Sequence, residues 1–259
     1  MEKQIKLMKD LAKKAGKIQI GKLGQKHNIE YKGVINIVTE VDKECEKLIV
    51  GGLKEKYPDY DVIAEEGSGD RTKSGYRWHV DPLDGTTNFA HDFPFFCVSI
   101  ALEKDGELIA GVIYDPNRDE VFEAIKGEGA FMNGKKISVS DHSPLNKSMV
   151  ATGFAYNVQE GERMNNLDNF IKFIKSARAV RRPGSAAIDL AWVACGRLDG
   201  FWELFLKSWD MAAGVVIIRE AGGMVSSFDG SEQDLYGTQI LASNARIHEE
   251  MEQVLLKAL

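Results

Sequence analysis

The stretch "WHVDPLDGTTNFAHDFPF" (residues 78–95) places two acids, Asp81 and Asp84, behind an apolar run and ahead of a glycine and two threonines. The apolar run predicts the end of a buried strand, and the residues after Asp84 predict a tight turn into a short helix. Aspartates at such positions often do no more than satisfy local backbone groups. The positions of other acids indicate a further role here.

Acids occupy the same kind of position elsewhere in the chain. Asp42 stands at the start of an expected helix, and Glu65 and Glu66 follow an apolar strand in "VIAEEG". Asp210 lies in the first turn of an expected helix in "KSWDMAAG", where the helix dipole favours an anion. Carboxylates that converge on one point repel, and without compensation at least one takes up a proton. A divalent cation removes that conflict, so the pattern predicts a metal site.

All of these candidate ligands are oxygen donors. Oxygen sites suit Mg²⁺, Mn²⁺ or Ca²⁺ over zinc, and magnesium usually works beside a substrate phosphate. Two ions roughly 3.5–4 Å apart can activate a water and stabilise a leaving oxygen. Backbone N–H groups at a helix start bind phosphate, which gives Gly85 and Thr86 a role. The pattern therefore predicts hydrolysis of a phosphate ester.

Two rival interpretations of the same stretch fail on spacing. A phosphatase that forms an aspartyl phosphate needs its nucleophile two residues before the second aspartate, and Pro82 occupies that position. An EF-hand counted from Asp81 needs oxygen ligands at its third position and a glutamate at its twelfth. Those positions are Leu83 and Asp92. Neither covalent catalysis nor an EF-hand is expected.

Composition limits the remaining possibilities. The chain has 259 residues, 44% of them hydrophobic, and a net charge of −6, which suits a full core and gives no basic field for nucleic acid. The three cysteines are widely spaced and form no CxxC pair, as expected of reduced thiols in a cytoplasmic protein. No secretion signal or membrane span is expected.

The order of elements predicts the fold class. Helical periodicity covers residues 2–24 and 40–56, and short apolar runs with Gly and Pro between residues 61 and 125 predict strands. Blocks of helices and antiparallel hairpins favour a layered α+β fold. We expect a single catalytic unit, residues 1–259, made of two tightly packed α/β lobes with a boundary near residues 145–150. Further helices are expected over 161–176, 185–195, 209–220 and from residue 245 onward.

Four segments together resemble one enzyme family. "DPLDGTTNF", "AEEG", "KGVINIVTEVD" and "WDMAAGVVIIREAGG" are similar to the inositol monophosphatase family, whose superfamily includes fructose-1,6-bisphosphatase. The resemblance runs from Lys32 to Gly223. It implies a magnesium-dependent, lithium-sensitive phosphomonoesterase with an αβαβα sandwich of mixed, largely antiparallel sheets. It also implies a homodimer, while the charge and hydropathy described above indicate no direct binding to nucleic acid and no membrane association.

The resemblance also implies the ligands of the metal. Two or three Mg²⁺ ions are expected, with Mn²⁺ as a possible substitute and Ca²⁺ and Li⁺ as inhibitors. The expected metal ligands are Glu65, Asp81, the Leu83 carbonyl, Asp84 and Asp210.

The same resemblance assigns the remaining roles. Thr86 and Asp42 form the expected dyad that orients the attacking water, with Glu65 completing the catalytic set. Gly85 and Thr86 are expected to bind the phosphate, and Lys32 matches the family's mobile-loop lysine. The expected substrate contacts are Asp84, Gly184, Ser185, Ala187, Glu203 and Asp210.

The implied reaction is hydrolysis of inositol-1-phosphate by a metal-activated water, without a covalent intermediate. Fructose-1,6-bisphosphate, NADP(H), nucleotide and histidinol-phosphate phosphatases remain alternatives, because they share the metal motif. A non-enzymatic alternative is a regulator that binds the transcription machinery, as some bacterial family members are thought to do.

Overall fold

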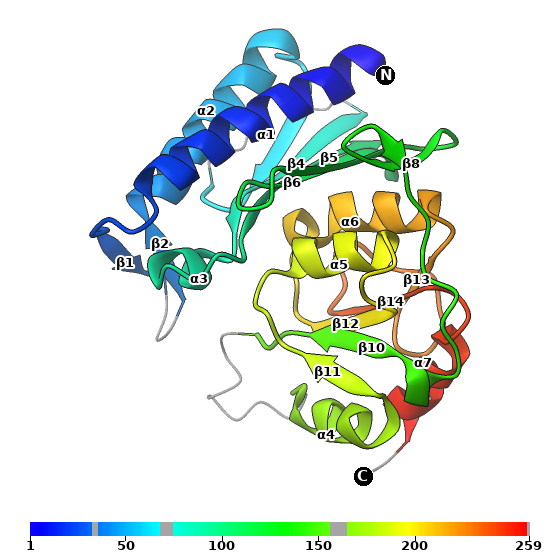
Figure 1. Ribbon diagram of the computed structural model, residues 1–259. Coiled ribbons are helices and arrows are strands. Elements are labelled where there is room, and N and C mark those ends of the chain that lie inside the picture. Colours follow the sequence, from blue (N-terminus) through cyan, green and yellow to red (C-terminus); the bar gives the residue numbers. More distant parts are fainter. Residues whose placement is uncertain (33–35, 68–74, 156–164, 258–259) are drawn as a thin grey trace.

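The chain folds into five alternating layers of helices and sheets in the computed structural model (Figure 1). The structure describes residues 1–32, 36–67, 75–155 and 165–257. Two helices cover a large sheet, two helices fill the space behind it, and a second sheet and two outer helices follow. This arrangement confirms the expected αβαβα sandwich of mixed sheets.

The outer layer at the N-terminal end is formed by α1 (Glu2–Lys22) and α2 (Glu40–Lys56). The predicted helix at residues 40–56 is confirmed in both bounds, and α1 ends two residues earlier than expected. Thr39 caps α2, because its hydroxyl accepts from the Val41 N–H at 3.1 Å. The apolar residues of both helices pack on the large sheet.

Within the described residues, the large sheet has seven strands in sequential order. Its first two strands run parallel and the others are antiparallel. Asp105-Gly106 and Asn133-Gly134 form hairpin turns between neighbouring strands, and all four residues have the positive φ that such turns require. The strands are β3 (Asp61–Ala64), β4 (Tyr76–Asp84), β5 (Cys97–Lys104), β6 (Glu107–Asp115), β7 (Glu120–Ile125), β8 (Gly129–Met132) and β9 (Lys135–Lys136).

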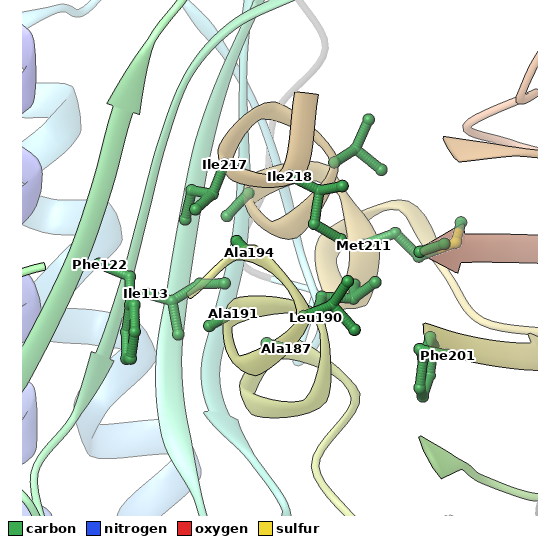
Figure 2. Packing of buried hydrophobic residues seen from close by; sticks show 14 of the residues in the cluster. Ile113, Phe122, Ala187, Leu190, Ala191, Ala194, Phe201, Met211, Ile217 and Ile218 are labelled. Carbon is green, nitrogen blue, oxygen red and sulfur yellow. The ribbon is translucent and has the colours of Figure 1, made fainter. Parts of the chain in front are cut away.

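The middle layer consists of α5 (Ala186–Ala194) and α6 (Ser208–Glu220). Figure 2 shows side chains of the large sheet, Ile113 and Phe122, facing these helices inside a buried cluster. Gly111 lets α6 approach closely, because a Cβ there would lie 2.7 Å from the Ala213 carbonyl oxygen.

A second sheet of five strands lies behind the middle layer, as described in the resolved ranges. It pairs β10 in parallel with β11 and β12, and its other pairs are antiparallel. The strands in spatial order are β11 (Ala179–Arg181), β10 (Met149–Thr152), β12 (Gly200–Leu204), β14 (Gln239–Ser243) and β13 (Met224–Ser226).

The last layer is formed by α4 (Leu167–Ser176) and α7 (His248–Leu256). Phe173 of α4 stacks on Trp202 of β12, with ring centroids 3.8 Å apart. The helix expected at 161–176 begins at Leu167, and residues 156–164 lie outside the described residues. The closing helix begins at His248, three residues later than expected.

Four smaller elements complete the described chain. A two-stranded antiparallel sheet precedes α2, and a short helix follows the acidic turn. The two-stranded sheet was not predicted. These elements are β1 (Ile29–Tyr31), β2 (Ile37–Thr39), α3 (Thr86–Ala90) and the 3₁₀ helix η1 (Leu145–Lys147). Among the helices of the described ranges, none has the length and apolar character that a bilayer span requires.

Candidate active site

The quoted stretch forms the end of β4 and the turn into α3. Asp81 is buried, and its Oδ1 accepts from the Leu83 N–H at 2.9 Å. Gly85 has a φ of 99°, and a Cβ there would lie 2.9 Å from the Phe95 carbonyl oxygen. Only glycine adopts this positive φ readily and also lacks the Cβ that would collide with the Phe95 carbonyl. The turn therefore brings Asp81, Asp84 and the start of α3 together.

Two amide side chains fix this turn from outside. Gln19 of α1 donates through Nε2 to the Pro82 carbonyl at 2.8 Å. Asn88 of α3 donates through Nδ2 to the Phe95 carbonyl at 2.8 Å and to the Pro183 carbonyl at 2.9 Å. The turn is thus tied both to the N-terminal helix and to the segment before α5.

Asp42 and Thr86 form a direct hydrogen bond. The Thr86 hydroxyl lies 2.7 Å from Asp42 Oδ1 and 3.1 Å from the Leu83 carbonyl oxygen. Asp42 is in the first turn of α2, where its Oδ2 accepts from the Thr39 N–H at 2.8 Å and the Thr39 hydroxyl at 2.5 Å. Burial raises the pKa of Asp42, although the hydrogen bonds from Thr39 and Thr86 lower it.

Asp84 is bound by the N-terminus of α5. Its Oδ2 accepts from the Ser185 hydroxyl at 2.6 Å and from the Ala187 N–H at 2.7 Å. Gly184 precedes them with a φ of 96°. Gly184, Ser185 and Ala187 were all expected to contact substrate. In this structure Ser185 and Ala187 direct their donors at Asp84 and so position that carboxylate.

Glu65 follows β3 and is anchored to β4, because its N–H donates to the Val80 carbonyl at 3.2 Å. The Lys32 ammonium lies 3.2 Å from Glu65 Oε1 and 2.5 Å from Glu66 Oε1. Burial raises the pKa of Glu65 to about 7, opposed by Lys32 and reinforced by the charges of Glu66 and Asp42.

Asp210 enters the site from α6. Its Oδ2 accepts from the Lys207 N–H at 2.6 Å, which closes the first turn of the helix. Burial raises its pKa well above the ordinary value, and the charges of Asp84 and Glu65 raise it further. Asp210 is therefore within electrostatic reach of acids on the large sheet.

The central carboxylates repel one another. Burial raises the pKa of Asp81 well above its usual range, and the charges of Glu65, Asp84 and Asp210 add to the rise. Burial also raises the pKa of Asp84, despite its donors from α5. Among the described residues, no three acidic, histidine or cysteine side chains yet surround one point as metal ligands do. The charges of these acids affect one another's pKa values, but their oxygens do not converge on a single point.

The donor chemistry nevertheless fits magnesium. Every candidate ligand is an oxygen, and the buried carboxylates already gain by neutralisation, as their raised pKa values indicate. A hard dication provides that neutralisation without a proton.

Two further buried acids, Glu203 and Asp189, lie beside the central carboxylates described above. We refer to these two acids together as the second acidic surface. Glu203 of β12 is buried, and both its carboxylate oxygens would lie 2.3 Å from a Cβ added at Gly153. Burial and the charges of Asp210 and Asp84 raise the pKa of Glu203 well above its usual range, opposed by Arg182. Glu203 is thus within electrostatic reach of Asp210 and Asp84.

Asp189 was missed in the sequence analysis. It lies in the first turn of α5, its Oδ1 is buried, and that atom has no hydrogen-bond partner in the described chain. Burial raises its pKa well above the usual range, and the charges of Glu203 and Asp84 contribute. Its position four residues after Ser185, on the helix that binds Asp84, was the available signal.

The sequence profile of the inositol monophosphatase family matches residues 1–259. The chain belongs to this family. It is accordingly a phosphatase that hydrolyses phosphoric monoesters, in a family that is generally dependent on magnesium and sensitive to lithium.

Individual relatives agree over most of the chain. The inositol-1-monophosphatase of Synechocystis sp. is 46% identical over 238 residues, which cover 90% of this chain and 81% of that protein. The Nus factor SuhB of Pseudomonas aeruginosa is 42% identical over 226 residues, covering 85% and 82%. The solved inositol monophosphatase of Anabaena (Nostoc) sp. superposes with a TM-score of 0.91 at 39% identity, covering 100% and 97%.

Proposed function

We propose that the chain hydrolyses inositol-1-phosphate to inositol and phosphate in a Mg²⁺-dependent reaction without a covalent intermediate. The observation that carries this proposal is the 2.7 Å hydrogen bond between Thr86 and Asp42, next to the buried, mutually repelling acids. A hydroxyl fixed by a carboxylate beside oxygen ligands is what a water-activating site needs.

Glu65, Asp81, Asp84, Asp210 and the Leu83 carbonyl bind two or three magnesium ions in this proposal. Magnesium supplies positive charge that lowers the pKa of water and stabilises the leaving oxygen. The residues of the chain supply the oxygen ligands. The raised pKa values of Asp81 and Asp210 support these roles.

The turn after β4 binds the phosphate and takes up the proton. The N–H groups of Gly85 and Thr86 donate to phosphate oxygens at the start of α3. Because the Thr86 hydroxyl donates to Asp42 Oδ1, its lone pairs remain able to accept a hydrogen bond from the attacking water. When the water gives its proton to Thr86, the original hydroxyl proton of Thr86 passes to Asp42. Glu65 completes the catalytic set by orienting the same water.

Lys32 neutralises this edge of the site. Its ammonium group lies between Glu65 and Glu66, the place where a third, weaker ion would bind. In this proposal Lys32 is the family's loop lysine, and its contacts with Glu65 and Glu66 support a place at the edge of the metal site.

The alcohol part of the substrate meets the second acidic surface. The proposed contacts are Asp84, Gly184, Ser185, Ala187, Glu203 and Asp210. Buried Glu203 and Asp189 offer carboxyl oxygens that accept hydrogen bonds from hydroxyl groups of the substrate. This supports an alcohol rich in hydroxyl groups, such as inositol.

A panel of phosphate esters tests the proposal. With Mg²⁺, we expect the highest kcat/KM for inositol-1-phosphate, loss of phosphate release with EDTA, and inhibition by Li⁺. Histidinol phosphate, fructose-1,6-bisphosphate, NADP⁺ and a nucleotide are the comparison substrates. A higher kcat/KM for any of them would replace inositol-1-phosphate as the substrate. Glu203→Ala should lower kcat/KM for inositol-1-phosphate more than for the comparison substrates, because the hydroxyl groups of inositol lose an acceptor.

We also propose a cytoplasmic homodimer. Cys45, Cys97 and Cys195 are unpaired thiols, which suits a reducing compartment. Leu167, Ile171 and Ile174 are exposed along one side of α4, and their spacing supports an interface there. Light scattering after gel filtration should give twice the chain mass, and Ile174→Glu should give the monomer.

A second candidate function is binding to the transcription machinery. The observation that favours it is the 42% identity to a protein named Nus factor SuhB. Capture of RNA polymerase by an Asp84→Asn protein would show binding separate from chemistry. No capture by either the parent or the variant would remove this candidate.

A further inference from the structure

A buried histidine connects the large sheet to α6. His79 lies two residues before Asp81 on β4, so both side chains leave the same face of the strand. His79 is fully buried, with Nδ1 3.0 Å from the Ser208 hydroxyl and Nε2 2.9 Å from Glu103 Oε2. Ser208 is the first residue of α6, two residues before Asp210.

The direction of these hydrogen bonds follows from Glu103. Its Oε2 also accepts from the Tyr236 hydroxyl at 3.0 Å, and Arg77 lies 3.3 Å from its Oε1. The pKa of Glu103 is lowered, and the hydrogen bond from His79 is the largest cause. Glu103 is therefore an ionised acceptor and His79 Nε2 is the donor. In the neutral imidazole, Nδ1 then accepts from the Ser208 hydroxyl.

The next residue of α6 is tethered in the same way. Ser99 of β5 donates through its hydroxyl to the Trp209 carbonyl at 3.2 Å. Ser99 pairs in register with Asp81 of β4. Two successive residues at the start of α6 are thus bound to the strands beside Asp81, and Asp210 follows directly.

We propose that His79 and Ser208 are positioning residues that set the place of Asp210 relative to Asp81 and thereby the affinity of the site for Mg²⁺. The proposal rests on the function proposed above, in which both acids are metal ligands. Neither His79 nor Ser208 contacts the metal or the substrate. They act by fixing the first turn of α6 against β4.

The chain contains a matched control. His248 at the start of α7 also lies between hydroxyl groups, with Ser226 and Ser243 each 2.8 Å from a ring nitrogen. Those residues tie α7 to β13 and β14, and none of the proposed metal ligands lies on these elements. Ser243→Ala therefore removes the same kind of hydrogen bond from the same kind of buried histidine, away from the site.

Titration calorimetry of Mg²⁺ alone into EDTA-stripped protein tests the proposal. Ser208→Ala should weaken Mg²⁺ binding about tenfold, the usual effect of losing a group that orients a metal ligand. Ser208→Thr keeps the hydroxyl and should restore the parent affinity. Ser243→Ala should lower the unfolding midpoint about as much as Ser208→Ala while leaving Mg²⁺ affinity unchanged.

Equal Mg²⁺ affinities of Ser208→Ala and Ser243→Ala would overturn the proposal. If Ser208→Ala does not fold, Ser208→Cys, which keeps the volume and weakens the donor, is compared in its place. A parent protein that binds no Mg²⁺ would remove the proposed metal site together with this role. A parent that binds Mg²⁺, with a Ser208→Ala protein that binds it equally well, would remove this role alone.

Discussion

Thr86 has one hydroxyl proton and two acceptors within reach, Asp42 Oδ1 at 2.7 Å and the Leu83 carbonyl at 3.1 Å. The shorter contact to a carboxylate is the stronger one. At the scale of the single residue, the proposed chemistry depends on which acceptor receives the Thr86 hydroxyl proton. Donation to Asp42 leaves the Thr86 oxygen free to accept a hydrogen bond from water.

Thr86→Ala should lower kcat by about 10²–10⁴-fold, the usual contribution of a positioned proton acceptor, with a smaller change in KM. Thr86→Ser keeps the hydroxyl and should retain most of the turnover. Phosphate release at saturating Mg²⁺ measures both variants, and circular dichroism checks their fold. Equal losses in the Ser and Ala variants would mean that the hydroxyl is not the active group.

At the scale of the element, close packing in the middle layer depends on glycine. A Cβ at Gly111 would lie 2.7 Å from the Ala213 carbonyl oxygen of α6, whereas a Cβ at Gly51 in α2 has nothing within 4 Å. The two glycines therefore form a matched pair. A side chain at Gly111 would collide with α6, whereas a side chain at Gly51 would meet no neighbouring atom.

Gly111→Ala should destabilise the fold by about 1–3 kcal/mol, because the backbone of α6 must shift. Gly51→Ala should stabilise it by roughly 0.5–1 kcal/mol, because alanine loses less backbone entropy in a helix. Urea unfolding of both variants at one pH measures the changes. A neutral Gly111→Ala would show that α6 can retreat from β6 at little cost.

The anchor of α7 should depend on pH. Burial lowers the pKa of His248 to about 4, against about 6.5 for an exposed histidine. The folded state therefore binds fewer protons between these values. The stability that neutral His248 contributes is complete above about pH 6.5 and falls as the pH decreases toward 4, by at most about 1.4 kcal/mol per pH unit.

Urea unfolding of the parent and a His248→Gln variant from pH 4 to 8 measures this effect as a difference. We expect the parent to lose stability relative to the variant below about pH 6.5, with a constant difference above it. A difference that does not change with pH would show that His248 keeps its ordinary titration in the folded protein.

Sequence patterns predicted the elements that carry their own periodicity. The bounds of α2 follow from its apolar spacing, its cap at Thr39 and Pro58 beyond its end. The pair β1 and β2 was missed, because three-residue strands show no measurable alternation. Short elements stabilised by pairing depend on contacts that local patterns do not contain.

At the scale of the whole molecule, the buried acids link metal binding to stability. Repulsion and burial raise the pKa values of Asp81 and Asp210, and that of Glu65 to about 7. A raised folded pKa contributes stability that is complete below the unfolded pKa and is lost as the pH rises through the folded value. Without metal, the protein should lose stability as the pH rises through neutrality.

Mg²⁺ should reverse that loss, so the rise in Tm on adding Mg²⁺ should be larger at pH 8 than at pH 6.5. At a concentration a hundred times Kd, binding stabilises by about 2.7 kcal/mol.

Asp81→Asn should raise the Tm of the metal-free protein, abolish phosphate release and remove most of the Mg²⁺ effect. Calorimetric scans with NaCl of equal ionic strength as the control measure this. An equal Mg²⁺ effect in the variant would exclude Asp81 as a ligand.

The expected layered fold was confirmed, and the structure places the predicted acids within reach of one another. Asp189 and the contact between His79 and Ser208 were not foreseen. His79 and Ser208 are 129 residues apart, and neither stands in a motif that indicates a partner. Contacts of this kind arise only when α6 packs on β4, and the sequence carries no local sign of them.

The hydrogen bonds from the start of α5 to Asp84 should limit how substitutions can change the substrate specificity. A substitution that reshapes residues 184–187, which are proposed to contact the alcohol, also displaces the hydroxyl and amide that orient Asp84. Altered recognition should then be accompanied by slower turnover. Gly153 packs against Glu203, and a Cβ there would lie 2.3 Å from both carboxylate oxygens of Glu203. Side chains introduced at Gly153 should therefore displace Glu203 and leave the donors of Asp84 in place, so they should alter substrate preference with less loss of turnover than substitutions at Ser185.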